Sequence, residues 1–187
     1  SIWRIISSST SLSNLGDGVS TSGGVIVESS AVASNAGHGI VTGAGSIVRG
    51  NSVRANGTGT TGDGIRASNG SAVKDNSVRF NHGVGLVLTF PTTFSGNTIT
   101  GNEVAGGRYG THFMYSHDNL VTGNRYVGNV VGIFAMYSRG LTLERNLLAA
   151  STGAAGMGLG LKESSAVTVR DNALVQIRQE HEWNNRL

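Results

Sequence analysis

The chain has 187 residues, with 29 Gly, 1 Pro, 0 Cys and only 13% charged residues. The absence of cysteine excludes a disulfide scaffold, and glycines without a three-residue period exclude collagen. The formal net charge is +3 and the Lys and Arg are scattered, which argues against nucleic-acid binding, because such proteins gather basic residues on one surface. No segment approaches the roughly 18 apolar residues of a membrane span, so no membrane insertion is expected. Because the chain begins at Ser1 and not at Met, we expect a processed or excised piece.

A short phrase recurs along the chain: an apolar residue, two small or polar residues, then an asparagine. The asparagines of its copies are Asn51, Asn76, Asn97, Asn124, Asn146 and Asn172, separated by 25, 21, 27, 22 and 26 residues. Repeats of this length, with short β-prone segments between Gly, Asn and Asp, are typical of solenoids. The sequence therefore predicts an all-β fold, a single-stranded right-handed parallel β-helix of about seven coils of 21–27 residues.

Apolar or small residues recur eight positions before the apolar residue of each phrase. This column is Val19, Ile40, Ile65, Leu86, Phe113, Ala135 and Leu161, and we expect it to form one buried stack. The asparagines are expected to form an internal ladder, because stacked amides can hydrogen-bond to the coils above and below. A second column follows five residues later, at Asn35, Asn56, Asn81, Asn102 and Asn129.

The repeat predicts one β-helix domain over residues 1–187, with an N-terminal cap at 1–15, coils at 16–175 and a C-terminal cap or tail at 176–187. An open β-helix exposes unpaired strand edges, which caps must cover. The apolar residues suited to this are Trp3, Ile5 and Ile6 at one end and Ile177, Trp183 and Leu187 at the other.

The spacing between columns varies mainly at one corner of each coil. Residues 57–63, 103–111 and 152–159 should therefore project from the same side of the solenoid. Insertions on one side of a solenoid often build its binding face.

Two methionines, Met114 and Met136, are 22 residues apart, which is one coil. Strand alternation points both outward, roughly 5 Å apart, with His112 on the same face and His117 just beyond the strand. Thioethers with imidazole form a soft ligand set suited to Cu(I). The alternative is that both methionines simply pack beneath a loop, as methionine often does in irregular gaps.

The phrase Met-Tyr-Ser occurs twice, so Tyr115 and Tyr137 should also stack, either for structure or as contacts to a partner protein. Glycoside hydrolysis requires two carboxylates about 5–10 Å apart. Asp63, Glu103 and Asp118 have no obvious partner in the sequence. We therefore expect a protein that is not an enzyme, with no catalytic residues.

Three segments resemble the NosD family: RYGTHFMYSHDN at 108–119, VGIFAMYSR at 131–139 and GMGLGLK at 156–162. The resemblance covers about residues 103–175. NosD proteins are periplasmic β-helix proteins that act with an ABC transporter in maturing the copper site of nitrous-oxide reductase. The resemblance implies a non-catalytic role in copper delivery in the periplasm or outside the cell. It also implies Cu(I) as the bound metal and protein partners, namely transporter components, a copper enzyme or a copper chaperone.

The remaining coils, residues 16–102, resemble generic carbohydrate-binding and sugar-hydrolase β-helices, and the segment from Ile177 onward resembles neither. The alternative function is therefore a structural or carbohydrate-binding β-helix, including a truncated or engineered scaffold without retained activity.

Overall fold

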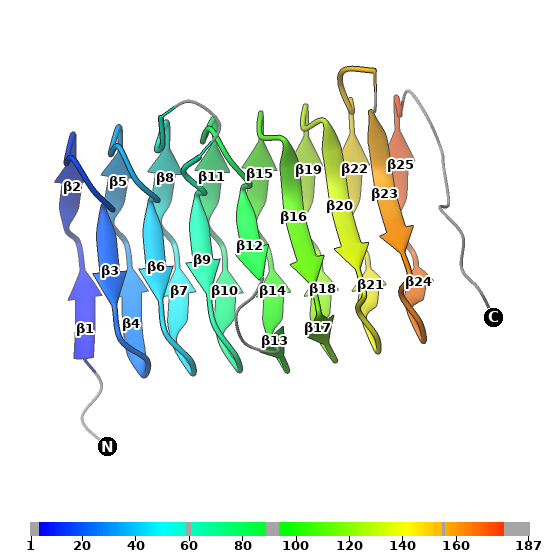
Figure 1. Ribbon diagram of the computed structural model, residues 1–187, viewed down its shortest axis with the longest axis horizontal. Helices are drawn as coiled ribbons and strands as arrows, with labels where there is room; N and C mark the ends of the chain where they lie inside the picture. Colours follow the sequence, from blue (N-terminus) through cyan, green and yellow to red (C-terminus); the bar gives the residue numbers. More distant parts are fainter. Residues whose placement is uncertain (1–3, 59–60, 89–93, 155, 178–187) are drawn as a thin grey trace.

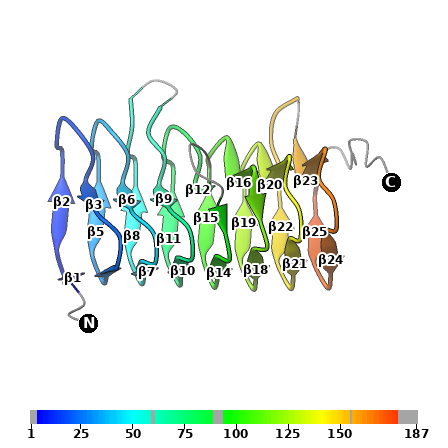
Figure 2. The same cartoon turned by 60° about the horizontal axis from the view of Figure 1, so that its bottom comes forward.

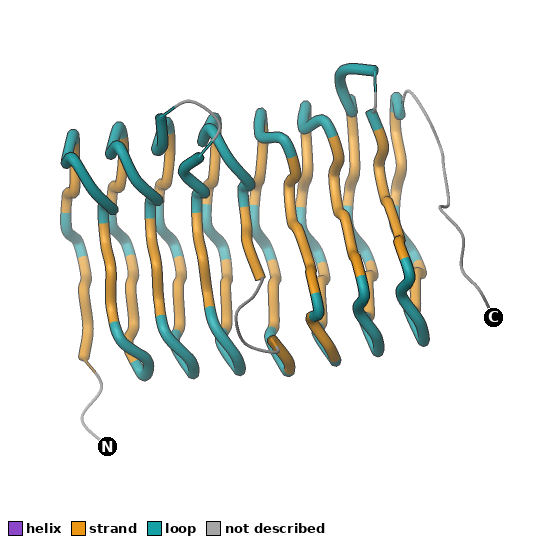
Figure 3. The backbone as a smooth tube through the Cα atoms, viewed as in Figure 1, coloured by secondary structure: helices purple, strands orange, loops and turns teal. Residues whose placement is uncertain are grey.

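The computed structural model describes residues 4–58, 61–88, 94–154 and 156–177. They form three parallel sheets stacked as a β-solenoid of about seven turns, which confirms the predicted fold class. Each coil passes through sheet A, sheet B and sheet C in turn, and advances along the axis in a right-handed sense (Figure 1). The described residues contain strands, turns and loops but no helix (Figure 3), so none is present that could cross a membrane.

Sheet A contains β1 (Arg4–Ser7), β4 (Val25–Glu28), β7 (Ile47–Arg49), β10 (Ala72–Lys74), β14 (Thr98–Thr100), β18 (Leu120–Thr122), β21 (Thr142–Glu144) and β24 (Thr168–Arg170). Sheet B contains β2 (Thr10–Leu12), β5 (Ala31–Ala33), β8 (Ser52–Arg54), β11 (Ser77–Arg79), β15 (Glu103–Ala105), β19 (Arg125–Val127), β22 (Leu147–Ala149) and β25 (Ala173–Val175). Sheet C contains β3 (Val19–Thr21), β6 (Ile40–Thr42), β9 (Ile65–Ala67), β12 (Leu86–Leu88), β16 (Tyr109–Met114), β20 (Val131–Met136) and β23 (Met157–Lys162). A further pair joins β13 (Phe94–Ser95) to β17 (Ser116–His117).

The corner between sheets A and B has the same length in every coil. A buried residue of sheet A is followed five positions later by one of sheet B, as in Val48 and Val53 or Leu143 and Leu148. A residue with positive φ, such as Arg145 at 53°, makes the bend, and an asparagine or serine follows it. A left-handed residue costs roughly 1–2 kcal/mol, so the corner requires compensating interactions.

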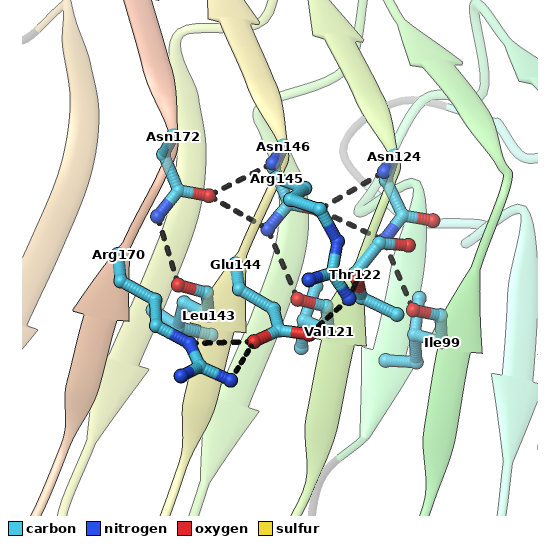
Figure 4. Close-up of polar contacts among 10 residues, drawn as sticks. All are labelled: Ile99, Val121, Thr122, Asn124, Leu143, Glu144, Arg145, Asn146, Arg170 and Asn172. Atoms are coloured by element: carbon cyan, nitrogen blue, oxygen red, sulfur yellow. Dashed lines mark hydrogen bonds and ion pairs between the residues drawn. The ribbon is translucent and has the colours of Figure 1, made fainter.

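The asparagines supply these interactions as a continuous ladder. Its members are Ser30, Asn51, Asn76, Asn102, Asn124, Asn146 and Asn172. At Asn146, Oδ1 accepts hydrogen bonds from the backbone N and the Nδ2 of Asn124, both at 3.0 Å. Its Nδ2 donates to Asn172 Oδ1 at 2.9 Å and to the Val121 carbonyl at 3.0 Å (Figure 4). Every polar atom of this buried amide is therefore satisfied.

The ladder was predicted correctly, but the asparagine assigned to it was wrong in one coil. Asn102 occupies the first ladder, and Asn97 belongs to a separate one, in which its Oδ1 accepts the Ser71 N–H and its own N–H donates to Asn119. In the second column Gly107 replaces Asn102, and its N–H donates to Asn129 Oδ1 at 3.0 Å. The reason is an insertion between β12 and β14, part of which lies outside the described residues.

The predicted buried stack is divided into two neighbouring stacks, because ten residues separate Thr111 from Val121 whereas eight separate Ile65 from Val73. Val19, Ile40, Ile65 and Leu86 continue in register through Thr111, Ile133 and Leu159. Phe113, Ala135 and Leu161 form a second stack two residues further along the strands. The burial itself was predicted correctly, since Ile65 and Leu86 are only 1% and 2% exposed, although Val19 at the first coil is half-buried.

The prediction of a single variable corner was also wrong. The β8–β9 and β22–β23 connections rise from the same edge (Figure 2), as expected for the insertions near residues 57–63 and 152–159. Residues 103–111, however, are β15, a three-residue bend and the start of β16, not a long projecting loop. The corner between sheets C and A varies too, because eight residues separate Ile65 from Val73 but thirteen separate Leu86 from Ile99.

The ends of the stack are only partly described. Ile6 packs against the core, whereas Ile5 is 56% exposed. Ile177 lies against Gly158 of β23. Trp3, Trp183 and Leu187 lie outside the described residues, so the capping role of the two termini stays a prediction.

Replacing Asn146 with alanine should lower the free energy of unfolding by about 3 kcal/mol, because several buried donors and acceptors lose their hydrogen-bond partners at once. Asn172→Ala is the matched control at the half-buried end of the ladder, where water can replace the lost amide and the loss should be smaller. Urea unfolding of both variants measures the difference. Equal losses would contradict the role assigned to the interior of the ladder.

Candidate functional site

The outer face of sheet C is widest where β16, β20 and β23 lie side by side. These strands have six residues each, whereas the earlier strands of the sheet have three. Met114 pairs in register with Met136 and then with Lys162. The sequence correctly predicted that the two methionines occupy equivalent positions on neighbouring coils.

Both methionine side chains are half-buried, so their thioethers are neither core residues nor fully solvated. Their column ends at the exposed Lys162, whose Nζ lies 5.8 Å from the centroid of the Tyr137 ring. This cation–π geometry associates the ammonium group with the tyrosine.

His112 lies on β16 two residues before Met114, in an aromatic enclosure. Its ring centroid is 5.0 Å from that of Tyr109 and 5.7 Å from that of Phe134, which pairs with it from the next coil. Phe134 has room because the next residue in the column is Gly160, where a Cβ would come within 2.5 Å of the phenyl ring. The Arg108 guanidinium lies 5.2 Å over the Tyr109 ring and covers the other end of the aromatic group.

Burial in this enclosure favours the uncharged form of the His112 ring. Burial lowers its pKa below the ordinary value of 6.5, the negative charge of Asp63 raises it, and the positive charge of Arg108 lowers it. Its Nε2 is buried without a hydrogen-bond partner. A neutral imidazole with a free nitrogen is the form that binds a metal ion.

His117 is placed differently from the other three predicted ligands. The chain turns at Tyr115, whose φ is 50°, and His117 therefore lies on β17, beyond the end of sheet C. Its Nδ1 accepts a hydrogen bond from the Arg139 backbone N–H at 3.2 Å, so the proton of the neutral ring is on Nε2 and the ring could bind a metal only after giving up this arrangement. Among the described residues, no group of three or more His, Cys, Asp or Glu could hold a metal ion. The predicted set depends instead on methionine sulfur.

The repeated Met-Tyr-Ser phrase has a structural explanation. Tyr115 and Tyr137 both make the bend after sheet C with φ of 50°, and their rings stack with centroids 5.0 Å apart. The serines that follow point inward, where the Ser116 N–H donates to Ser138 Oγ at 3.2 Å. The phrase therefore places a thioether outside, a tyrosine at the bend and a hydroxyl inside.

Sequence reasoning missed a second polar cluster on the same face, in earlier coils. Asp63 Oδ2 lies 3.3 Å from His38 Nδ1 and 3.4 Å from Arg66 Nε. Burial alone would raise the pKa of Asp63, but the contact with His38, the Val84 N–H and the charge of Arg66 lower it below its ordinary value. The 25-residue spacing of His38 and Asp63, one coil, was the available signal.

A family model matches the part of the chain that contains the predicted metal ligands. Residues 90–182 match the model of the family described as periplasmic copper-binding protein (NosD), which confirms the resemblance inferred for about 103–175. This stretch contains the methionine pair, His112 and His117. None of the curated proteins compared with the chain matches it.

Several solved structures share the fold. The periplasmic alginate epimerase AlgG superposes with a TM-score of 0.69 at 18% identity, over 93% of this chain and 50% of that one. DFA-IIIase from Arthrobacter chlorophenolicus A6 gives a TM-score of 0.69 at 16% identity, over 87% and 44%. The Streptococcus pneumoniae surface protein and adhesin PfbA gives 0.57 at 12%, over 86% and 67%. At these identities the likeness shows the fold alone, and the chain spans about half the length of AlgG.

The two charges acting on His112 allow a test with opposite signs. Asp63→Asn should move the His112 titration midpoint further down, and Arg108→Gln should move it up, because Asp63 raises and Arg108 lowers its pKa. An NMR titration of the His112 ring measures both shifts. Since the folded pKa is depressed, the unfolded chain binds more protons just below pH 6.5 and stability should fall there with decreasing pH. Shifts in the same direction would contradict this electrostatic arrangement.

Proposed function

We propose that this chain handles Cu(I) in the periplasm through Met114, Met136 and His112, and delivers it to a copper enzyme or copper chaperone. One observation carries the proposal: two methionines pair in register on neighbouring strands, and on the same face, two residues before Met114, lies His112, whose buried Nε2 has no hydrogen-bond partner. The match of residues 90–182 to a family described as periplasmic and copper-binding supports the choice of metal and compartment.

The ligand chemistry favours Cu(I) over harder ions. Thioether sulfur is soft and polarizable, so this set should bind Cu(I) better than Zn(II) or Mg(II). Burial lowers the pKa of His112 and so favours the neutral ring, which is the form of histidine that binds copper. His117 would serve as an additional ligand during transfer only after its Nδ1 is released from the Arg139 N–H.

The half-buried position of the methionines suits a transfer site. Copper has to leave such a site as well as arrive, and a few ligands on an open sheet should hold it less tightly than a buried cage. Tyr115, which is 45% exposed, and Lys162 lie next to the pair and would meet an incoming protein. In our proposal the partners are the copper enzyme, a copper chaperone or components of an ABC transporter.

A competition titration with a chromophoric Cu(I) chelator tests the site. Met114→Leu/Met136→Leu removes both thioethers while nearly preserving volume, so packing should survive and affinity should fall at least about tenfold. Met157→Leu is the matched control, because Met157 also lies on a strand of sheet C but at the start of β23, whereas the methionine pair is in register with Lys162 at its end. Equal Cu(I) affinity of the double variant and the wild type would show that the methionines serve only in packing.

The alternative is a structural or carbohydrate-binding β-helix, which the fold shared with an alginate epimerase keeps open. We propose binding without catalysis for this chain. Incubation with alginate or pectate should therefore yield no new reducing ends or unsaturated products. Cleavage that disappears in Asp63→Asn or Asp118→Asn would instead establish an enzyme.

A further inference from the structure

One left-handed residue makes the bend that follows each strand of sheet B, and its N–H donates to the last carbonyl of the next strand in the sheet. Apart from Gln176 in the last coil, the residues of this column other than Phe80 are small: Ser13, Ser34, Ala55, Gly106, Gly128 and Ala150. Phe80 has a φ of 54° and is 64% exposed. A bulky side chain is disfavoured in this conformation and an exposed ring gains little from burial, so the fold itself does not explain Phe80.

The Phe80 ring is nevertheless held in place. The next residue in the column is Gly106, where a Cβ would come within 2.5 Å of Cδ1 and 2.8 Å of Cε1 of the ring. One edge of the ring therefore rests against the Gly106 backbone, in space that only a glycine leaves open, while most of the side chain faces solvent. Such a ring offers a fixed apolar surface to a ligand.

Arginine side chains lie beside this bend on the outer face of sheet B. Arg79, the residue before Phe80, is in register with Arg54 on the preceding coil (Figure 1). Arg79 forms an ion pair with Glu103, which also lies 4.0 Å from Arg125. Arg54 is exposed and contacts no acid among the residues that the structure describes. Its guanidinium group is therefore available to an anion.

Arg108 supplies a second available cation on the following coil, two residues after Gly106. Its side chain is exposed and its guanidinium group lies 5.2 Å over the Tyr109 ring. In the described part of the chain it has no acidic partner either. Phe80 thus lies between Arg54 on the coil before it and Arg108 on the coil after it.

We propose that Arg54, Phe80 and Arg108 bind a chain of sugar acids, a polyuronate, that runs along the solenoid axis over the corner between sheets B and C. The C–H face of one sugar ring would lie on the phenyl ring, and carboxylates of neighbouring sugars would bind the two guanidinium groups. Successive coils are about 4.8 Å apart, which is comparable with the length of one sugar unit. Arg54 and Phe80 lie outside residues 90–182, and the proposal does not depend on the copper function.

Isothermal titration calorimetry with three ligands tests the class of ligand. Hexagalacturonate should bind to saturation, whereas its fully methyl-esterified form, which keeps the sugar rings and loses the charges, should bind at least about tenfold more weakly. Polyphosphate of similar charge should also bind more weakly, because it has no apolar face for Phe80. Equal binding of the ester or of polyphosphate, or no binding of hexagalacturonate, would overturn the proposal.

Phe80→Gly separates a role in binding from a role in folding. Glycine adopts a φ of 54° without strain, so the urea midpoint of the variant should not fall below that of the wild type. Its affinity for hexagalacturonate should fall at least about tenfold, because the stacking surface is gone. Unchanged affinity, or a large loss of stability, would show that the ring does not serve a ligand.

The two cations are tested with a matched control. Arg54→Gln and Arg108→Gln should each weaken hexagalacturonate binding about tenfold, as expected when a charge-assisted hydrogen bond is lost. Arg4→Gln removes the same charge from an exposed position on β1 of sheet A and should leave the affinity within about twofold. Equal weakening by all three variants would indicate attraction by net charge and would refute the site.

Discussion

The hydrogen-bonded asparagine at the corner between sheets A and B is the constraint on which the rest of this β-helix depends. Each coil bends there through one left-handed residue, and the following amide bonds to the coils on both sides. Because the amide must reach a backbone N–H and a carbonyl in fixed directions, the corner cannot gain or lose a residue. The same coils are held by ion pairs outside, as where Glu144 lies between Arg145 and Arg170 (Figure 4).

The other two corners also carry ladders, through Asn35, Asn56 and Asn81 after sheet B and through Ser71, Asn97 and Asn119 before sheet A. The segments that join these ladders to sheet C nevertheless differ in length from coil to coil. Sheet C lies between them and varies in strand length and in its outward residues. Its inward residues remain apolar or small, because they must fill the interior shared by all coils. Chemistry can therefore change on the outer face of sheet C without disturbing the ladder on the other side of the coil.

The sequence could predict the fold because buried columns repeat, but it could not fix the register of every coil. Asn97 and Asn102 are five residues apart, which is also the distance between the two asparagine columns. One asparagine pair therefore fits two registers, and only the pairing with Asn76 and Asn124 decides between them. The methionine pair escaped this ambiguity, since β16 and β20 belong to coils of equal length. The surroundings of His112 depend on Tyr109, Phe134 and the space over Gly160, which no periodic pattern specifies.

Two histidines on this face illustrate how one scaffold produces different chemistry. His38 has its Nδ1 committed to the backbone of the next coil, because its column lies at a bend where an amide needs an acceptor. His112 lies within a strand, whose amides are already paired in the sheet, so its ring is left to the side chains around it. Aromatic rings there remove water without supplying a hydrogen bond, and thereby favour a neutral His112 ring. The position of a histidine relative to the bend thus decides whether its ring is held by the backbone or left free for a ligand.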